Sequence, residues 1–379
     1  MTTAARRPRV GVDFHVWDGI FQGSRSHLLG LYSAAIQHAP EMDFVFFLGD
    51  TLGLRASHAP FGAPNVQLVK MAHRSGLIRL GWQLPWLQWQ HRIDLMHYQY
   101  RIPPLRPGPC ACTVHDILFE THPQYFARRF IWQSRLSSRH AMRAARLLLT
   151  VSRFTQHELA RVYGVDPQAI HITANAVDRL RFRPGADGVD VVQELGLQPQ
   201  AYMLTVGRLE PRKNHRTILE AYAQLGPDAP LLVIVGQRDF QYELLLDAFG
   251  SADLRQRVRL LENVSDDQLP ALMRHALLFV YPAFAEGFGM PILEAMASGV
   301  PVVTSDTTAM PEVAGGAAIL VDPHSPDQLV AAMQRVIRDP ALRTSMARAG
   351  LEAAARFDWD KSAAVLVSAL REHFSPALT

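Results

Sequence analysis

Cysteine and long apolar runs are both scarce in this sequence of 379 residues. Its two cysteines, Cys110 and Cys112, are too few for a disulfide framework, and we expect them to pack in a core because no further cysteine completes a metal site. No apolar run approaches the roughly 18 residues that a membrane span needs. The first nine residues contain no apolar stretch, so they do not predict a secretory signal. We therefore expect a cytoplasmic chain.

Charge is unevenly distributed along the sequence. Residues 1–185 hold 22 Lys/Arg and 11 Asp/Glu, a balance of +11, whereas residues 186–379 hold 16 and 24, a balance of −8. A basic half indicates an anionic partner, and an anionic membrane surface fits one. No basic aromatic motif of a known nucleic-acid module is present, so we expect no nucleic-acid partner. A chance distribution of solvated charge is the alternative.

Short β-rich runs alternate with helical patterns throughout, which predicts an α/β chain with parallel, doubly wound sheets. The periodicity breaks at Phe182–Gly188, so we expect one domain over 1–183, a second over 184–357 and a separate terminal helix over 358–379. The predicted strands are 9–14, 44–48, 66–69, 95–98, 111–114, 147–151, 170–173, 202–206, 231–235, 258–261, 277–281, 301–304 and 318–321.

The most informative motif runs from Glu286 to Glu294, two carboxylates separated by seven residues. It follows the apolar run that ends at Tyr281, so Glu286 is expected in a loop after a strand. Glycines in that loop allow a ligand to approach the backbone, and Pro291 suits the first turn of a helix that carries Glu294. Exposed amides beside two carboxylates suit a ligand that is both anionic and rich in hydroxyls, such as a nucleotide-sugar.

Several segments together resemble the retaining glycosyltransferases of family four, also called group 1. The specific ones are Glu286–Asp322 and Val206–His215; weaker ones are Thr113–Asp116, Thr150–Thr155 and Ile172–Asp178. The resemblance spans roughly residues 10 to 360 and implies the GT-B fold, two Rossmann-like domains with an interdomain cleft. It also implies that the last helix packs back on the first domain.

The resemblance and the chemistry of the residues assign roles to the site. Arg208 and Lys213 are the candidate clamp on the leaving phosphates. Glu286 is expected at the transferred sugar, Glu294 at the ribose hydroxyls and His115 near the reacting centre, without a role as general base. The remaining predicted donor contacts are Gly23 and Ser24 at the first helix start, Asn263 and Val264 at the nucleobase, and Gly287, Phe288, Gly289 and Met290 through the loop backbone.

We expect no metal and no cofactor besides the nucleotide-sugar. Asp358 and Asp360 have the spacing of a metal-binding pair, but they open the terminal helix, where acids act as caps. A glycan phosphorylase would need a lysine that carries pyridoxal phosphate. The only lysines are Lys70, Lys213 and Lys361, and Lys213 is assigned to the phosphates, so we do not expect a phosphorylase. A relative without activity is expected to have lost one of the motif residues, and all are present.

The acceptor side of the sequence is less specific. Trp82, Trp86 and Trp89 lie at helical spacing with basic flanks, which fits a helix docked on a bilayer interface or, equally, a core stripe. Because Pro85 interrupts the pattern, we favour the core. Arginines at 128, 129, 135, 139 and 143 give weak support for an anionic surface.

The resulting hypothesis is a retaining, metal-independent hexosyltransferase at the inner face of the cytoplasmic membrane. It would move a mannose-type sugar from a GDP-linked donor to a lipid-linked surface polysaccharide such as O-antigen. A UDP-glucose or UDP-N-acetylglucosamine donor, and a nucleotide-sugar 2-epimerase of the same fold, are the alternatives.

Overall fold

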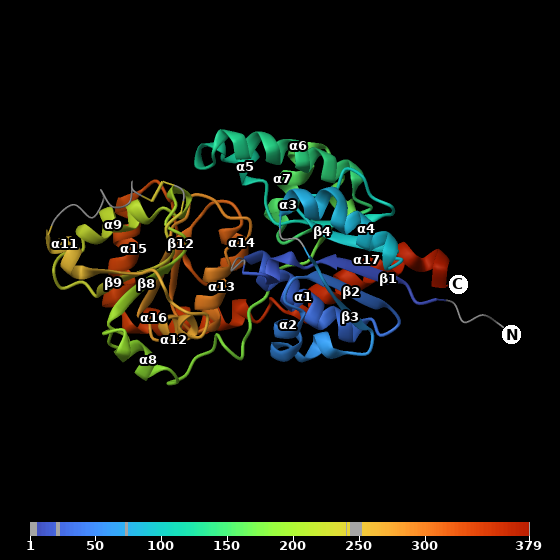
Figure 1. The fold of residues 1–379 in the computed structure, drawn as a ribbon. Coiled ribbons are helices and arrows are strands. Elements are labelled where there is room, and N and C mark those ends of the chain that lie inside the picture. The colour runs from blue at the N-terminus through green and yellow to red at the C-terminus, as the bar shows by residue number, and fades with distance from the viewer. Residues whose placement is uncertain (1–5, 20–22, 73–74, 240, 243–251, 379) are drawn as a thin grey trace. The chain divides into compact units, whose positions relative to one another are not determined.

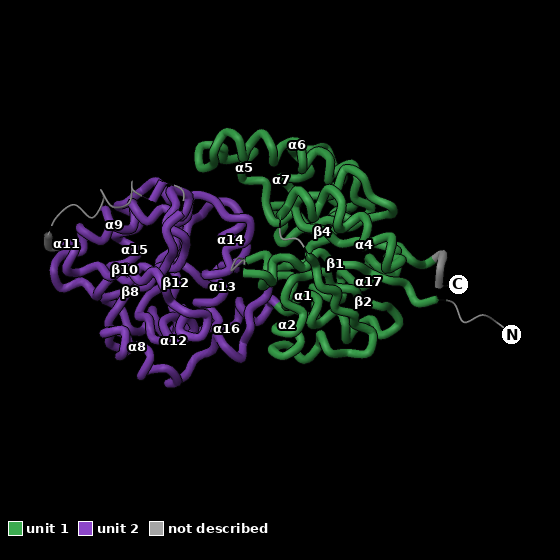
Figure 2. Tube along the Cα trace, in the orientation of Figure 1, with its two compact units in different colours: residues 1–175, 358–379 green, residues 176–357 purple. Residues whose placement is uncertain are grey.

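The structure, a computed structural model, describes residues 6–19, 23–72, 75–239, 241–242 and 252–378. The chain forms two compact units, Met1–Asn175 with Asp358–Thr379 (unit 1) and Ala176–Phe357 (unit 2) (Figure 2). Each unit has one parallel sheet, as the alternating pattern predicts. Parallel strands need crossover connections, and helices provide them in both units apart from one loop connection, 100–109, in unit 1 (Figure 1).

Unit 1 contains a seven-stranded sheet in the order β3-β2-β1-β4-β5-β6-β7. Its strands are β1 (Arg9–Asp13), β2 (Asp43–Leu48), β3 (Val66–Lys70), β4 (Leu95–Gln99), β5 (Cys110–Val114), β6 (Leu147–Thr150) and β7 (Ile170–Ile172). Every residue of β4 and β5 is buried, and the polar side chains among them, such as His97 and Gln99, have partners inside the unit. Cys110 and Cys112 are free thiols buried in this core.

Helices cover both faces of the unit 1 sheet. One face packs against α1 (Gly23–His38) and α17 (Trp359–Leu378), and the other against α4 (Leu84–Gln90), α6 (Arg128–Ala144) and α7 (Arg153–Tyr163). The final helix α17 therefore belongs to the first unit, where it packs directly on α1. The shorter helices and turns are η1 (His15–Trp17), α2 (Thr51–Ser57), η2 (Ala59–Gly62), α3 (Gly76–Ile78), η3 (Arg79–Gln83), α5 (Leu118–Thr121), η4 (Pro123–Tyr125) and η5 (Pro167–Ala169).

Unit 2 contains a six-stranded sheet in the order β10-β9-β8-β11-β12-β13. The strands are β8 (Tyr202–Val206), β9 (Leu231–Val235), β10 (Val258–Leu261), β11 (Leu278–Tyr281), β12 (Val302–Ser305) and β13 (Ile319–Val321). The helices are α8 (Val189–Glu194), η6 (Pro211–Lys213), α9 (His215–Ala223), α11 (Ala252–Arg257), α12 (Gln268–Arg274), α13 (Met290–Ala297), α14 (Met310–Ala314), α15 (Pro326–Arg338) and α16 (Pro340–Ala354).

The boundary between the units lies at Asn175, earlier than the expected break near residue 183. The segment after Phe182 belongs to unit 2 because Arg274 of α12 holds it. The Arg274 guanidinium donates hydrogen bonds to the carbonyl oxygens of Arg181, Arg183 and Asp187. A Pro/Gly-rich sequence thus marks a packed segment here rather than a free linker.

The tryptophan stretch differs from the prediction of a core stripe. Trp82, Trp86 and Trp89 are 61%, 42% and 70% exposed, whereas the residues between them, Gln83, Leu84, Leu87 and Gln88, are buried. Pro85 does not end the helix. A π-helical turn, η3, precedes it, and such a wider turn accommodates a position where proline supplies no N–H.

Candidate active site

The loops that follow β8 and β11 carry the strongest candidate residues. These two strands are neighbours at the centre of the unit 2 sheet, and the chain order proceeds outward from them in opposite directions. Such a topological switch point leaves a crevice at the carboxyl ends of the strands, where open α/β sheets bind ligands. Arg208 and Lys213 follow β8, and Glu286 follows β11.

Glu286 is the centre of a buried ion-pair cluster. Its Oε1 accepts hydrogen bonds from the Arg212 guanidinium at 2.9 Å, from the Tyr281 hydroxyl at 2.9 Å and from the Lys213 ammonium. Lys213 also donates to the Tyr281 hydroxyl at 2.8 Å. All three donors converge on one carboxylate oxygen, so none of them occupies Oε2.

Electrostatics hold this cluster in its charged form. Burial by itself would raise the pKa of Glu286, but the positive charges of Arg212 and Lys213 outweigh it and lower the pKa to about 2. Burial lowers the pKa of Lys213, and the charge of Glu286 opposes that effect. Burial raises the pKa of Tyr281, so this hydroxyl remains a donor.

The predicted phosphate clamp is therefore not a pair of free cations. Lys213 is bound to Glu286, and Arg208 forms an ion pair with Asp239 at 2.5 Å. The two cationic side chains differ in access to solvent: Arg208 is 47% exposed, whereas Lys213 is 12% exposed. Arg208 is the side chain that can turn toward an anion without breaking a buried pair.

Local backbone conformation positions the cluster. Asn214 has a left-handed φ of 61° at the start of α9, and its side-chain amide donates to the carbonyl oxygens of Pro282 and Pro323, each at 2.8 Å. The bond to Pro282 joins the β8 loop to the β11 loop, and the bond to Pro323 joins it to the loop after β13. The amide of Phe284 bonds to the Arg212 carbonyl at 2.9 Å and adds a second link between the same loops.

The loop from Gly287 to Met290 leads into α13 as predicted from the sequence. Gly289 has a φ of 101°, a conformation that favours glycine, and it precedes the first residue of α13. Phe288 is buried against Phe357, and Gly287 is also buried. Met290 begins the helix with Pro291 after it.

Glu294 has different neighbours from Glu286. Burial raises its pKa to about 7, an effect that Arg181 opposes and Asp266 strengthens. Asp266 belongs to the loop after β10, which also carries the predicted nucleobase contacts Asn263 and Val264. Asn263 is exposed and Val264 half-buried. The structure therefore places the β10 loop near the α13 carboxylate.

In unit 1, His115 directly follows β5 and is buried. Its Nε2 lies 2.7 Å from Oε1 of Gln99, and its ring packs edge-on against His27 at 4.9 Å between centroids. Burial, with the nearby His27 and His97, lowers the pKa of His115 well below its usual range. The imidazole is therefore neutral at neutral pH. That His115 has no role as general base stays a prediction.

The remaining predictions fall at the start of α1 and at the terminal helix. Gly23 and Ser24 form the first turn of α1, while residues 20–22 of the same segment lie outside the described residues.

The acids at the start of α17 act at the helix terminus. Asp358 accepts a hydrogen bond from the amide of Asp360 at 2.8 Å. Asp360 pairs with His38. Within the described ranges, no group of three His, Cys, Asp or Glu side chains suits a metal ion.

Several residues of these clusters were not assigned from the sequence. Arg212 and Tyr281 complete the Glu286 cluster, and the position of Arg212 inside the segment after β8 was the available signal.

Two buried histidines of unit 1 were also not assigned. His27 bonds through Nδ1 to Oδ1 of Asn175 at 2.9 Å. His97 lies between the Tyr32 hydroxyl at 2.6 Å and the Thr113 hydroxyl at 2.8 Å. Neither histidine lies in a motif that the sequence alone singles out. His27 is one residue of helix α1 and His97 is one residue of strand β4.

Comparison with known proteins identifies the family of the chain. Residues 22–181 match the model "Glycosyltransferase Family 4", and residues 192–353 match "Glycosyl transferases group 1". The chain is 34% identical over 287 residues to O-antigen chain mannosyltransferase B of Escherichia coli, covering 73% of this chain and 75% of that protein. It is 28% identical to O-antigen chain mannosyltransferase RfbU of Salmonella typhimurium, over 60% of this chain and 61% of the relative.

Solved structures show the same fold at low identity. Sucrose-phosphate synthase from Thermosynechococcus elongatus superimposes with a TM-score of 0.78 at 19% identity, over 98% of this chain and all of that one. WaaG, a glycosyltransferase involved in lipopolysaccharide biosynthesis, gives 0.69 at 19% identity over 95% and 98%. The two parallel-sheet units are thus the Rossmann-like domains of the GT-B fold. The chain belongs to the group 1 glycosyltransferases and is a glycosyltransferase.

Proposed function

We propose that this glycosyltransferase moves a mannose-type hexose from a GDP-linked donor to a growing lipid-linked surface polysaccharide such as O-antigen. The observation that carries the proposal is the 34% identity to an O-antigen chain mannosyltransferase over three quarters of that protein. The predicted Glu286, Lys213 and Arg208 are all present at the carboxyl ends of the central strands of unit 2.

The proposed reaction retains the anomeric configuration and needs no metal. The bond between the anomeric carbon and the diphosphate breaks, and its electron pair goes to the phosphate oxygen. Arg208 and Lys213 stabilise that developing charge, where one well-placed donor contributes on the order of 10²–10³ in rate. The acceptor oxygen bonds to the same face of the sugar, and its proton passes to the leaving phosphate.

Binding of the diphosphate must compete with existing ion pairs. Lys213 pairs with Glu286, and Arg208 pairs with Asp239. We infer that the donor phosphates take over part of the charge of Lys213, while Glu286 turns its uncommitted oxygen to a sugar hydroxyl. Glu294 accepts the ribose hydroxyls, and the backbone near Asn263 and Val264 contacts the base. In this proposal His115 contacts the transferred sugar near the reacting centre.

Titration calorimetry with GDP, UDP and ADP in the presence of a chelator tests the donor. We expect GDP to bind more tightly than UDP and ADP without added metal. Preferential binding of UDP would replace the GDP donor by a UDP-linked one; the Anabaena HepE structures, whose fold is similar, contain UDP, glucose or UDP-glucose. A strict metal requirement would contradict the metal-independent mechanism.

Product analysis tests the reaction itself. With GDP-mannose and a mannose-containing acceptor, NMR of the new linkage should show the α configuration of the donor. Conversion of the nucleotide-sugar to its epimer without an acceptor would instead establish the 2-epimerase alternative.

A further inference from the structure

The outer surface of unit 1 carries four of the six tryptophans of the chain. Trp82, Trp86 and Trp89 form a ridge along η3 and α4, and the rings of Trp82 and Trp86 stack at 5.8 Å between centroids. Trp132 on α6 is 65% exposed. Exposure of four large aromatic rings to water is unfavourable, so a surface of this kind indicates a partner.

The outward side of α6 combines apolar and basic residues. Trp132, Leu136, Arg139 and Arg143 follow one another at spacings of four, three and four, which puts them on one side of the helix. The opposite side packs inward through Ser134, Ser138 and Ala141. All four outward residues are exposed. The helix contains no acidic residue.

The tryptophan ridge of η3 and α4 and the outward side of α6 belong to a single surface. Both helices pack their inner sides into the same core on the same face of the sheet, so their outer sides both point away from it. The loop between β4 and β5 joins them. Gln88 of α4 bonds to the Pro109 carbonyl at 3.4 Å, and Arg106 bonds to the Ala144 carbonyl at the end of α6 at 3.2 Å.

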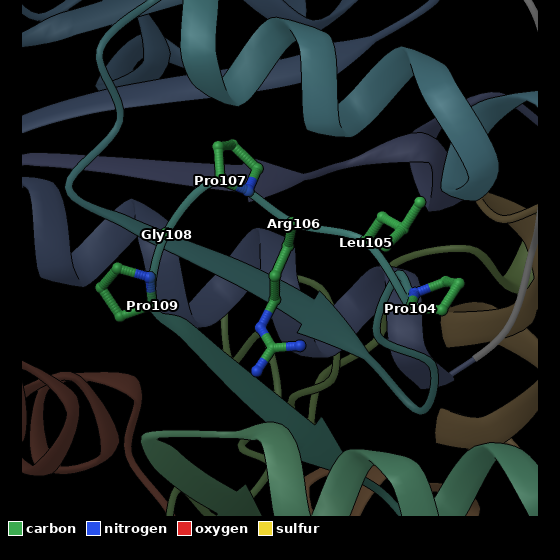
Figure 3. A pocket seen from close by; sticks show the side chains of 6 residues that line it. All are labelled: Pro104, Leu105, Arg106, Pro107, Gly108 and Pro109. Carbon is green, nitrogen blue, oxygen red and sulfur yellow. The ribbon is translucent and has the colours of Figure 1, made fainter.

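The joining loop adds to this surface. A pocket of about 440 Å³ is lined by Pro104–Pro109, with Arg106 extending across it and Leu105 at its edge (Figure 3). Leu105 is exposed. This loop leads into the first residue of β5, at the edge of the sheet opposite to His115, which follows the last residue of that strand. The pocket is therefore separate from the candidate active site.

Charge complementarity identifies the partner. Residues 51–157 hold 14 Lys/Arg and three Asp/Glu. On α6, Arg128, Arg129, Arg139 and Arg143 are exposed, and none of them forms an ion pair with a residue that the structure describes. Tryptophans favour the bilayer interface, and arginines attract anionic lipid headgroups. A second copy of this surface would bring unpaired arginines face to face.

We propose that the outer surface of α3, η3, α4 and α6 (the tryptophan–arginine surface) docks unit 1 on an anionic lipid bilayer. The tryptophans insert at the interface, and Arg139 and Arg143 contact lipid phosphates. The inference rests on the proposed function only in that a lipid-linked acceptor would lie in the same membrane. Across the described residues, every helix is too short or too polar to cross a bilayer, so attachment of this part would be superficial.

Sedimentation of the full chain with vesicles tests the proposal. We expect binding to vesicles of phosphatidylcholine with phosphatidylglycerol, weak binding to phosphatidylcholine alone, and release at high salt. Trp86→Ser with Trp89→Ser, and Arg139→Gln with Arg143→Gln, should each weaken binding by roughly tenfold or more, since one interfacial arginine contributes about fivefold. The control Arg335→Gln with Arg338→Gln removes two exposed charges from α15 and should have no effect.

Tryptophan fluorescence gives an independent measurement. Brominated lipids should quench the emission of the wild type, because four of its six tryptophans lie on this surface. Unchanged binding of the tryptophan variant, or sedimentation velocity that shows a dimer lost in that variant, would overturn the proposal. GDP titration of the same proteins separates the docking surface from the proposed donor. If the wild type binds GDP but not vesicles, only the docking surface is contradicted. If it binds vesicles but not GDP, only the proposed donor is contradicted.

Discussion

Two carboxylates separated by seven residues, Glu286 and Glu294, are placed in opposite electrostatic environments. Arg212 and Lys213 keep Glu286 ionised despite its burial, with a pKa of about 2. Glu294 lacks comparable compensation, and burial raises its pKa to about 7. Carboxyl groups whose pKa values diverge in this way have different roles. Glu286 acts as a permanent anion within a cationic cluster, whereas Glu294 changes charge near neutral pH.

Replacement of Glu286 by Gln should destabilise the protein at pH 7. The substitution leaves Lys213 buried without its anion, while Arg212 keeps its pair with Glu210, and we expect a loss of about 3–5 kcal/mol. Because the folded pKa is depressed, the stability from Glu286 is present above its unfolded pKa near 4.5 and is lost as pH falls toward 2. The difference in melting temperature between wild type and variant should shrink over that interval.

The matched control is Glu220→Gln. Glu220 pairs with Arg216 on the surface of α9, where both side chains are well exposed. Such pairs contribute about 0.3–0.5 kcal/mol. An equal loss of melting temperature in the two variants would contradict the assignment of a special role to the buried cluster.

Replacement of Glu294 by Gln should raise stability at pH 8 and weaken nucleotide binding. The folded pKa is raised above the usual value of 4.5, so the native state loses stability as pH rises from about 4.5 to 7, and the variant avoids this loss. The melting temperature of E294Q should exceed that of the wild type at pH 8 and match it at pH 5. The exposed Glu352→Gln serves as control.

The same variant tests ligand recognition. If the carboxylate accepts the ribose hydroxyls, wild-type affinity for GDP should fall from pH 8 to pH 6 as Glu294 gains a proton. E294Q should bind more weakly and lose this part of the pH dependence. Identical pH profiles in calorimetric titrations would show that Glu294 does not contact the nucleotide.

At the scale of elements, the loops after neighbouring strands must approach very closely. A Cβ at Gly236, directly after β9, would lie 1.9 Å from the carbonyl oxygen of Gly207, directly after β8. This contact involves backbone, so the loop that carries Arg208 would have to move. Glycine at this position permits the close approach of the loops after β8 and β9.

Gly236→Ala should therefore lower both melting temperature and affinity for GDP. The displaced β8 loop would change the position of Arg208, and we expect affinity to fall by about tenfold or more, the scale of a lost charge-assisted contact. Gly62→Ala is the control, since a Cβ at Gly62 meets no atom within 4 Å. Wild-type affinity of G236A in calorimetric titration would show that this loop does not bind the phosphates.

At the scale of the whole molecule, the chain ends in the unit where it began. Helix α17 buries Ala363, Leu366, Val367 and Leu370 in the core that α1 and the central strands form. Its Trp359 fits against Gly30 of α1, where a Cβ would lie 2.1 Å from the indole ring. Unit 1 is therefore incomplete without the last residues of the sequence.

Leu366→Ala should destabilise unit 1 by about 2–5 kcal/mol, as expected for a cavity in a packed core. Differential scanning calorimetry should show a lower transition for unit 1 and an unchanged one for unit 2. Val365→Ala on the exposed side of the same helix is the control. A shift of both transitions by the same amount would contradict independent packing of the two cores.

Local sequence determined the strands and the chemistry of the main motifs. The predicted runs 202–206, 231–235 and 258–261 coincide with β8, β9 and β10. Strands β8 and β9 are largely buried and mostly apolar, whereas the edge strand β10 is mostly half-buried and includes Arg259. The Glu286 loop and the start of α13 followed from glycine and proline, whose effects on the backbone are local.

Tertiary structure decided which side chains are partners and which surfaces remain exposed. Tyr281 and Arg212 meet Glu286 only because β8 and β11 are neighbours, and no local spacing encodes that adjacency. The tryptophan pattern fitted a core and a membrane surface equally, since helical periodicity identifies an apolar face but not what covers it. The packing of α4 through Leu84 and Leu87 assigns the opposite, tryptophan-bearing side to the outside.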